Sequence, residues 1–175
     1  MSWNQDLANY NRLGQVYYAC NQAGATVTLI NTSTATGFIL SNPWGSGKKL
    51  LISQVNFTYT TVPTATAIVF LCQSIAVSTT AHSGVTALQV YSADGSGAAT
   101  SAVGRAANAA TTPNLPVYAR ALGYSPTTPA TTGGLTVTDQ VDGAIALVPG
   151  SYAQISYITT APVGITYMSW VEVPV

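Results

Sequence analysis

The stretch of sequence that decides the fold runs from residue 50 to residue 60 and reads LLISQVNFTYT. Its larger side chains are those of Leu50, Ile52, Val55, Phe57 and Tyr59. Apolar and polar residues alternate along it, which is typical of a β-strand with one buried face. The alternation slips by one residue near residues 53–54, which predicts a β-bulge at that point.

Working outward, further strands are predicted wherever short apolar or alternating segments recur between turn sequences. They cover residues 15–20, 25–30, 36–40, 65–77, 85–91, 117–122, 135–138, 144–148, 152–159 and 165–173. The segment 65–77 is apolar almost throughout, which predicts a central strand buried on both faces. Gly- and Pro-rich turns separate the segments, and many short strands with such turns predict an antiparallel sandwich or barrel.

No segment shows sustained helical spacing of apolar residues, so the sequence predicts an all-β chain without a helix. The Ala-rich residues 98–110 are interpreted as loop, because Gly104 and Asn108 interrupt them and no apolar stripe appears. Two long loops are predicted, over residues 92–116 and 125–134. Loops of this length are often functional, so both are candidates for surface that meets a neighbouring molecule.

The organisation expected is a single domain over residues 15–175, preceded by an N-terminal arm over residues 1–14. A chain of 175 residues is long enough for one domain with a real core and short for two. The first fourteen residues are mostly polar and carry two isolated aromatics, Trp3 and Tyr10. Because interface energy concentrates in aromatics, Trp3 and Tyr10 are the candidate contacts to a partner or to another subunit.

The charge content is unusually low. Charged residues make up 6% of the chain, against roughly a quarter in an ordinary soluble domain, and the net charge is zero. Only Lys48 and Lys49 are adjacent cations, so the basic cluster that nucleic acids or anionic membranes require is missing. Near-zero net charge promotes association, so a homodimer or homotrimer is expected.

No motif in the sequence predicts an enzyme, a cofactor or a metal site. Residues 42–49, NPWGSGKK, differ from a phosphate-binding loop in the first Gly and in the residue after the Lys. His82 is the single histidine and lies in a turn-like segment. Asp139 and Asp142 are three residues apart next to a turn. The preference of Asp for turns explains their presence better than a calcium site or a pair of catalytic carboxylates does.

The cysteines, the apolar runs and the first residues indicate in which cellular compartment the chain is made. Cys20 and Cys72 lie in apolar segments and are interpreted as two buried free thiols. The apolar run 65–77 is shorter than the roughly 20 residues of a membrane helix. Residues 1–6 show neither the basic cluster nor the apolar stretch of a secretory signal. The chain is therefore expected to be made, and to assemble, in a cytoplasm.

Two segments resemble small virion proteins of tailed phages. The first is residues 36–52, TGFILSNPWGSGKKLLI, and the second is residues 149–152, PGSY, together with residues 167–174, YMSWVEVP. The resemblance implies a jelly-roll-like β-sandwich that acts as a decoration or cement protein on a phage head, within the virion. It implies the major capsid protein as partner, for which Trp3 and Tyr10 are the candidate capsid contacts, and it brings no active-site residues with it.

Other classes of function stay open beside this one. A receptor- or glycan-binding domain of a phage fibre or spike is the main alternative, and exposed Trp or Tyr residues grouped in one patch would favour it. An enzyme such as a glycan hydrolase is disfavoured, because no acid, base and nucleophile come together in the sequence.

Overall fold

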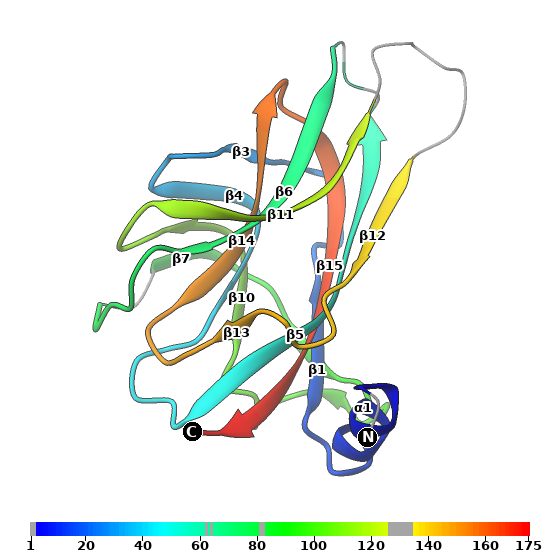
Figure 1. The fold of residues 1–175 in the computed structure, drawn as a ribbon, viewed down its shortest axis with the longest axis vertical. Helices are drawn as coiled ribbons and strands as arrows, with labels where there is room; N and C mark the ends of the chain where they lie inside the picture. Colours follow the sequence, from blue (N-terminus) through cyan, green and yellow to red (C-terminus); the bar gives the residue numbers. More distant parts are fainter. Residues whose placement is uncertain (1–2, 62, 64, 81–82, 126–134) are drawn as a thin grey trace.

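A computed structural model of the chain shows two β-sheets packed face to face, with one short helix at the N-terminal end (Figure 1). The described residues are 3–61, 63, 65–80, 83–125 and 135–175. Their elements are α1 (Trp3–Arg12), β1 (Val16–Cys20), β2 (Ala25–Thr26), β3 (Thr28–Leu29), β4 (Thr34–Ser41), β5 (Lys48–Thr61), β6 (Ala67–Ser74), β7 (Ser83–Ala87), β8 (Val90–Ser92), β9 (Gly97–Ala98), β10 (Arg105–Thr111), β11 (Pro116–Ser125), β12 (Thr136–Gln140), β13 (Ala146–Leu147), β14 (Tyr152–Thr159) and β15 (Val163–Pro174). The predicted β-sandwich is confirmed.

The strand order separates the two sheets. Sheet A runs β12-β5-β15-β1-β8-β9, with β13 paired to β5 and β2 paired to β15. Sheet B runs β11-β6-β14-β4-β10-β7, with β3 alongside β14. Within the described part of the chain, every strand pairing is antiparallel except that of β3 with β14. The chain crosses repeatedly from one sheet to the other, as it does in double-sheet jelly rolls.

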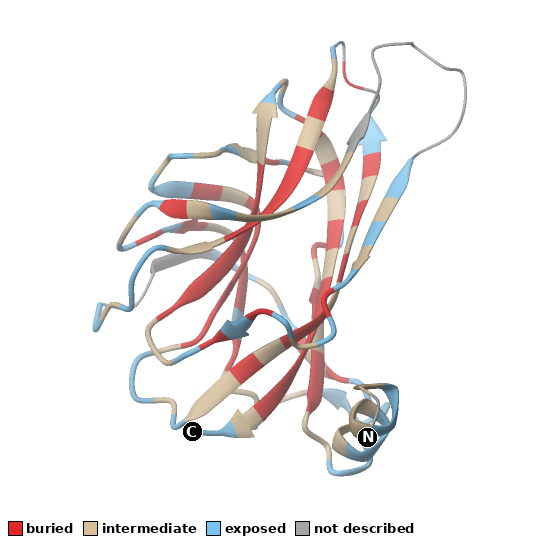
Figure 2. Ribbon diagram, viewed as in Figure 1, coloured by how far each residue is buried: buried red, intermediate tan, exposed pale blue. Residues whose placement is uncertain are grey.

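The core lies between the sheets, and its residues come from alternate positions of the strands (Figure 2). The largest fully buried side chains include those of Trp170, Phe38, Phe57, Leu71 and Ile155. The predicted central strand is β6, which lies between β11 and β14 and is buried on both faces at Leu71 and Cys72. Burial of these side chains supplies the main driving force for folding.

The predicted β-bulge is confirmed at the predicted place. Along the β5–β15 pair, Gln54 lies opposite Ser169, but Trp170 lies opposite Ile52, so Ser53 is the extra residue. The bulge lets Ile52 and Val55 both reach the core, although three positions separate them. It also explains why the alternation in the sequence slips there.

Two segments predicted as single strands are each divided between the sheets, so these predictions were wrong. Residues 25–30 form β2, which pairs with β15 in sheet A, and β3, which pairs with β14 in sheet B. Residues 85–91 likewise divide between β7 in sheet B and β8 in sheet A. Val27 is buried where the first segment crosses. Alternation reports which side chains are buried and does not reveal a change of hydrogen-bonding partner.

The prediction of no helix was wrong for the N-terminal segment. Helix α1 leaves exposed side chains on one face and half-buried ones on the other. The half-buried set is Trp3, Asp6, Leu7, Tyr10 and Asn11, which has helical spacing. Its apolar stripe has only three members among polar residues, so the sequence signal is weak. A helix of this length is marginal in water, and its packing beside β1 stabilises it.

The prediction of one long loop over residues 92–116 was also wrong, because this segment contains β9 and the seven-residue strand β10. Ala106, Ala107 and Ala110 of β10 are buried. Alanine has little intrinsic preference for strands, and here the pairing of β10 with β4 and β7 overrides that preference. Of the second predicted loop, residues 126–134 lie outside the described part of the chain.

A buried carboxylate joins three distant segments. Glu172 of β15 is 1% exposed, and its Oε1 accepts hydrogen bonds from the backbone N–H groups of Val103 and Gly104 at 2.8 and 2.9 Å. Its Oε2 lies 3.0 Å from Nζ of Lys48, at the start of β5. The indole Nε1 of Trp170 also points at Oε1, at 3.4 Å. These contacts compensate for taking the charge out of water.

We predict that Glu172→Ala lowers the free energy of unfolding by about 3 kcal/mol, because two buried N–H groups lose their acceptor. Urea denaturation followed by tryptophan fluorescence measures the change. Lys49→Ala is the control, since Lys49 forms no ion pair within the described residues, and it should stay within about 0.5 kcal/mol of the parent chain. Equal stability of the two variants would contradict a structural role for the carboxylate.

Candidate functional site

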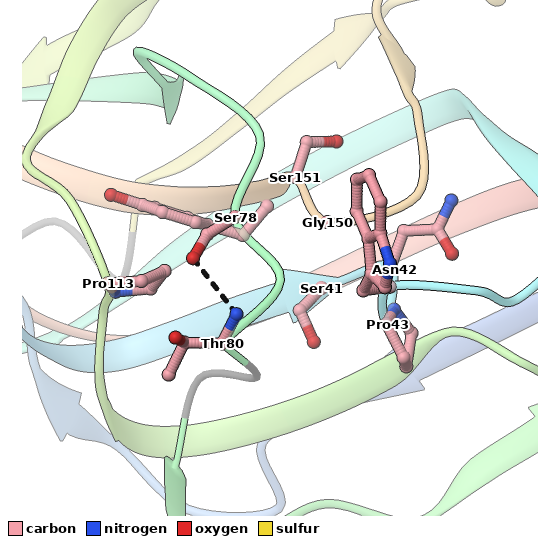
Figure 3. A pocket seen from close by; sticks show the side chains of 10 residues that line it. Ser41, Asn42, Pro43, Ser78, Thr80, Pro113, Gly150 and Ser151 are labelled. Carbon is pink, nitrogen blue, oxygen red and sulfur yellow. Dashed lines mark hydrogen bonds between the residues drawn. The ribbon is translucent and has the colours of Figure 1, made fainter.

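Four loops meet at one end of the sandwich, which we call the loop end: residues 42–47, 75–80, 112–115 and 148–151. They contribute side chains to one shallow hollow (Figure 3). The connections β4–β5, β6–β7 and β13–β14 gather on the left of Figure 1, and α1 lies at the lower right. None of the loop-end residues is Asp, Glu, Lys or Arg. The loop end is therefore an uncharged surface built from segments distant in sequence.

Asn42 holds these loops together. Its side-chain Nδ2 donates to the carbonyls of Lys48 and Leu147, both at 2.8 Å. Its backbone N–H donates to Ser151 O at 2.9 Å, and its carbonyl accepts from Gly150 N at 2.8 Å. Asn42 is 1% exposed, so these bonds are shielded from competing water. One side chain thus ties the β4–β5 loop to the segment around β13.

The β13–β14 turn requires a glycine at its centre. Gly150 has a φ of +87°, which side chains rarely tolerate. A Cβ there would lie 2.5 Å from the Ser78 carbonyl oxygen and 2.9 Å from the Trp44 ring. The N–H of Ser78 donates to Gly150 O at 2.9 Å, which joins the β6–β7 loop to the same turn. Because no side chain stands at Gly150, the Trp44 indole packs directly against the backbone of the β13–β14 turn.

The fourth loop is tied in through a buried tyrosine. The hydroxyl of Tyr152 donates to the carbonyl of Asn114 at 2.5 Å, and Asn114 Nδ2 donates to Ala76 O at 3.1 Å. In the β6–β7 loop, Thr80 N–H donates to the Ser78 hydroxyl at 3.1 Å (Figure 3). Hydrogen bonds therefore connect all four loops, so the surface is pre-organised.

Large apolar side chains project from this framework. They are Trp44 at 55% exposed, Ile75 at 65%, Val77 at 52%, Leu115 at 49% and Val148 at 36%. Each of the four loops supplies at least one of them. An exposed apolar patch of this kind marks an interaction site more often than a scattered surface residue does. Trp and other large apolar groups in a rigid setting are also the residues that carry most interface energy.

A second hollow at the loop end has a volume of about 220 Å³, and Ile75, Val77 and Val148 are among the residues that line it. The hollow drawn in Figure 3 is too small for an organic ligand. Its volume is about 10 Å³, room for about one water molecule. A larger groove of about 560 Å³ lies elsewhere, between β8 and β10, and small residues such as Ala99, Ala102 and Ala106 line it. Exposed aliphatic side chains line the larger hollow at the loop end, and such an apolar surface favours contact with a macromolecule.

The two candidate contact residues lie on α1, away from the loop end (Figure 1). Both Trp3 and Tyr10 are half-buried on the inward face of the helix. A Cβ at Gly143 would lie 2.6 Å from the Trp3 ring, so the indole packs on the β12–β13 turn. Whether either residue contacts another molecule stays a prediction. The sequence contains one signal for Trp44, an aromatic residue inside a Gly- and Pro-rich turn.

The remaining candidate groups are not brought together. Asp139 is paired with Arg120 at 2.9 Å, and Asp142 forms the Asp142–Gly143 turn with positive φ at both residues. Within the described ranges, no three residues among His, Cys, Asp and Glu cluster. His82 lies outside the described residues. Cys20 and Cys72 are free, as predicted, although Cys20 is only half-buried.

Comparison with known proteins gives no relative: no family model, no curated protein and no solved structure matches the chain. Among the helices of the described chain, none has the length and apolar character needed to cross a membrane.

We predict that Asn42→Ala lowers the free energy of unfolding by about 2 kcal/mol, since two shielded carbonyls lose their donor. Trp44→Ala should lower it by less than about 1 kcal/mol, because more than half of that side chain is already exposed. Chemical denaturation monitored by circular dichroism gives both values. A larger loss for Trp44→Ala than for Asn42→Ala would mean that Trp44 serves the core and not the surface.

We also predict that Cys72 resists alkylation in the folded chain. Burial raises the pKa of its thiol to about 11, and a hydrogen bond with Ser156 offsets part of that rise. Burial also raises the pKa of Cys20, but Cys20 is partly exposed. Because the thiolate is the reactive form, iodoacetamide at pH 8 should label Cys20 first and Cys72 only after unfolding. Mass spectrometry of peptides from native and urea-treated samples reads out the order, and equal labelling in the native sample would contradict it.

Proposed function

We propose that the chain is a structural protein of a virus particle, a decoration or cement protein that stabilises the head of a tailed phage. The resemblance of residues 36–52 and of the C-terminal segments to virion proteins suggests this role. The observation that supports it best is the loop end, a rigid, uncharged surface that exposes Trp44 and four aliphatic side chains. Such a surface can bind a protein lattice through apolar and hydrogen-bonded contacts.

The partner we propose is the major capsid protein, with copies of the same chain as additional partners in a homodimer or homotrimer. Ten charged side chains in 175 residues leave few for ion pairs with a neighbour. Two of the acids, Glu172 and Asp139, are already paired within the chain. Contacts with the capsid would therefore involve little desolvation of charge, which favours close packing.

The second candidate function is a receptor- or glycan-binding domain of a phage fibre or spike. One specific observation favours it: on three neighbouring strands of sheet A, the Tyr18 ring contacts Tyr91 on one side and Tyr167 on the other. Grouped aromatics of this kind are common in binding surfaces.

We predict that attachment to phage heads survives molar salt and depends on the loop end. Apolar and hydrogen-bonded contacts are little screened by salt, whereas surface ion pairs are screened and contribute only about 0–1 kcal/mol each. Trp44→Ala and Ile75→Ser should each weaken binding about tenfold or more, as interface anchors do. Co-sedimentation of the purified chain with heads that lack it, at low salt and at molar salt, measures attachment.

Two controls make that test specific. Leu29→Ser removes an apolar side chain that is 46% exposed outside the loop end and should leave attachment unchanged. Deletion of residues 1–14 examines Trp3 and Tyr10, and we expect it to weaken attachment less than Trp44→Ala does. Release of the parent chain at modest salt, or normal attachment of both loop-end variants, would refute the proposed mode of binding.

A further inference from the structure

A row of three tyrosines crosses the outer face of sheet A. Tyr17, Ala19, Met168 and Trp170 point into the core, so the strand alternation places their neighbours Tyr18 and Tyr167 on the opposite face. Val90 is likewise a core residue, which places Tyr91 on the outer face of β8. We call Tyr91, Tyr18 and Tyr167 the tyrosine ladder.

The rings of the ladder contact one another in sequence across the sheet. The Tyr18 and Tyr91 centroids lie 5.5 Å apart with planes at 24°, a stacked pair. The Tyr18 and Tyr167 centroids lie 5.7 Å apart with planes at 31°. Because β1 runs between β8 and β15, the two neighbours flank Tyr18 on opposite sides. Such pairs of rings stabilise each other and hold the ladder in one conformation.

One end of the ladder leaves an aromatic face uncovered. Beyond Tyr91 lies the edge strand β9, in which Ala98 is the residue opposite Tyr91. Gly97 and Ala98 are both exposed, and neither has a side chain large enough to cover a ring. Tyr91 is half-exposed, and β9 offers no side chain that could cover the ring face pointing away from Tyr18.

The other end of the ladder continues into uncharged polar side chains. Asn56 lies opposite Tyr167 on β5, and Thr138 lies opposite Asn56 on β12. In the adjacent row Gln54 lies between Ser169 and Gln140, and Ser169 is 7% exposed. The groups open to a ligand are therefore those of Thr138 and Gln140, which are exposed, and of Gln54, which is half-buried; Asn56 Oδ1 is buried. Amides and hydroxyls both donate and accept hydrogen bonds, and these rows contain no charged residue.

We propose that the tyrosine ladder and its polar rows bind a neutral, unbranched oligosaccharide that lies across the strands of sheet A. A sugar ring has an apolar face of C–H groups and a rim of hydroxyls, which match the open ring of Tyr91 and the amide and hydroxyl rows. The absence of cations from these rows disfavours a sulfated or acidic sugar, whose charge would stay unpaired. The inference rests on the second candidate function, the glycan-binding domain, and gives it a site and a class of sugar; the site is distinct from the loop end and does not depend on the capsid role.

Isothermal titration of the full chain with maltohexaose, cellohexaose and chitohexaose tests the site, with a sulfated heparin hexasaccharide as the charged comparison. At least one neutral hexasaccharide should bind, and Tyr91→Ala should weaken that binding about tenfold or more. Tyr91→Phe keeps the ring face and should bind within about threefold of the parent chain. Urea denaturation of Tyr91→Ala shows that the variant is folded.

The outcomes separate this site from the proposed function. Trp44→Ala should bind the sugar as the parent chain does, and Tyr91→Ala should attach to phage heads as the parent chain does. The inference is overturned if no neutral hexasaccharide binds at millimolar concentration, if only the sulfated sugar binds, or if folded Tyr91→Ala binds the neutral sugar undiminished.

Discussion

The carboxylate of Glu172 is the constraint on which much of this structure depends. An ionised group at 1% exposure costs several kcal/mol unless it is paired and hydrogen-bonded. The fold provides Lys48 from the start of β5 and two backbone N–H groups from the segment before β10. Gly104 is part of the same arrangement, because a Cβ there would lie 2.9 Å from the Trp170 indole. The charge therefore specifies how the last strand, β5 and the β9–β10 connection meet.

Apart from the Arg120–Asp139 pair, the contacts that tie distant segments together elsewhere are mainly neutral hydrogen bonds. Asn42 ties the β4–β5 loop to the segment around β13, and Asn21 does the same for β1 and β15 by donating to Gly164 O and accepting from Thr166 N–H. Such bonds are not weakened by salt, and buried ones are strengthened by the low local dielectric. The sandwich is therefore held together mainly by neutral contacts, and its surfaces carry few charges. Both proposed surfaces, the apolar loop end and the tyrosine ladder, have this neutral character.

The two surfaces differ in what they can bind because they differ in shape and chemistry. The loop end gathers aliphatic side chains and one indole on connections, where the hydrogen bonds of four loops define their positions. The ladder instead lies on regular strands, where cross-strand pairing sets the spacing of the rings. Apolar side chains on a rigid rim suit a protein neighbour. Rings beside amides and hydroxyls suit a sugar.

The sequence alone determined the all-β class, most of the strands and the bulge at Ser53. Alternation with a period of two is a local consequence of burying one face, and the slip near residues 53–54 is local as well. The sequence could not show that residues 25–30 and 85–91 change sheets, because the choice of hydrogen-bonding partner depends on distant strands. It also missed α1 and β10, whose weak intrinsic preferences are overridden by contacts with β1, β4 and β7. The loop end and the ladder were decided by tertiary structure alone, since each joins residues that only the packing of the sheets brings together.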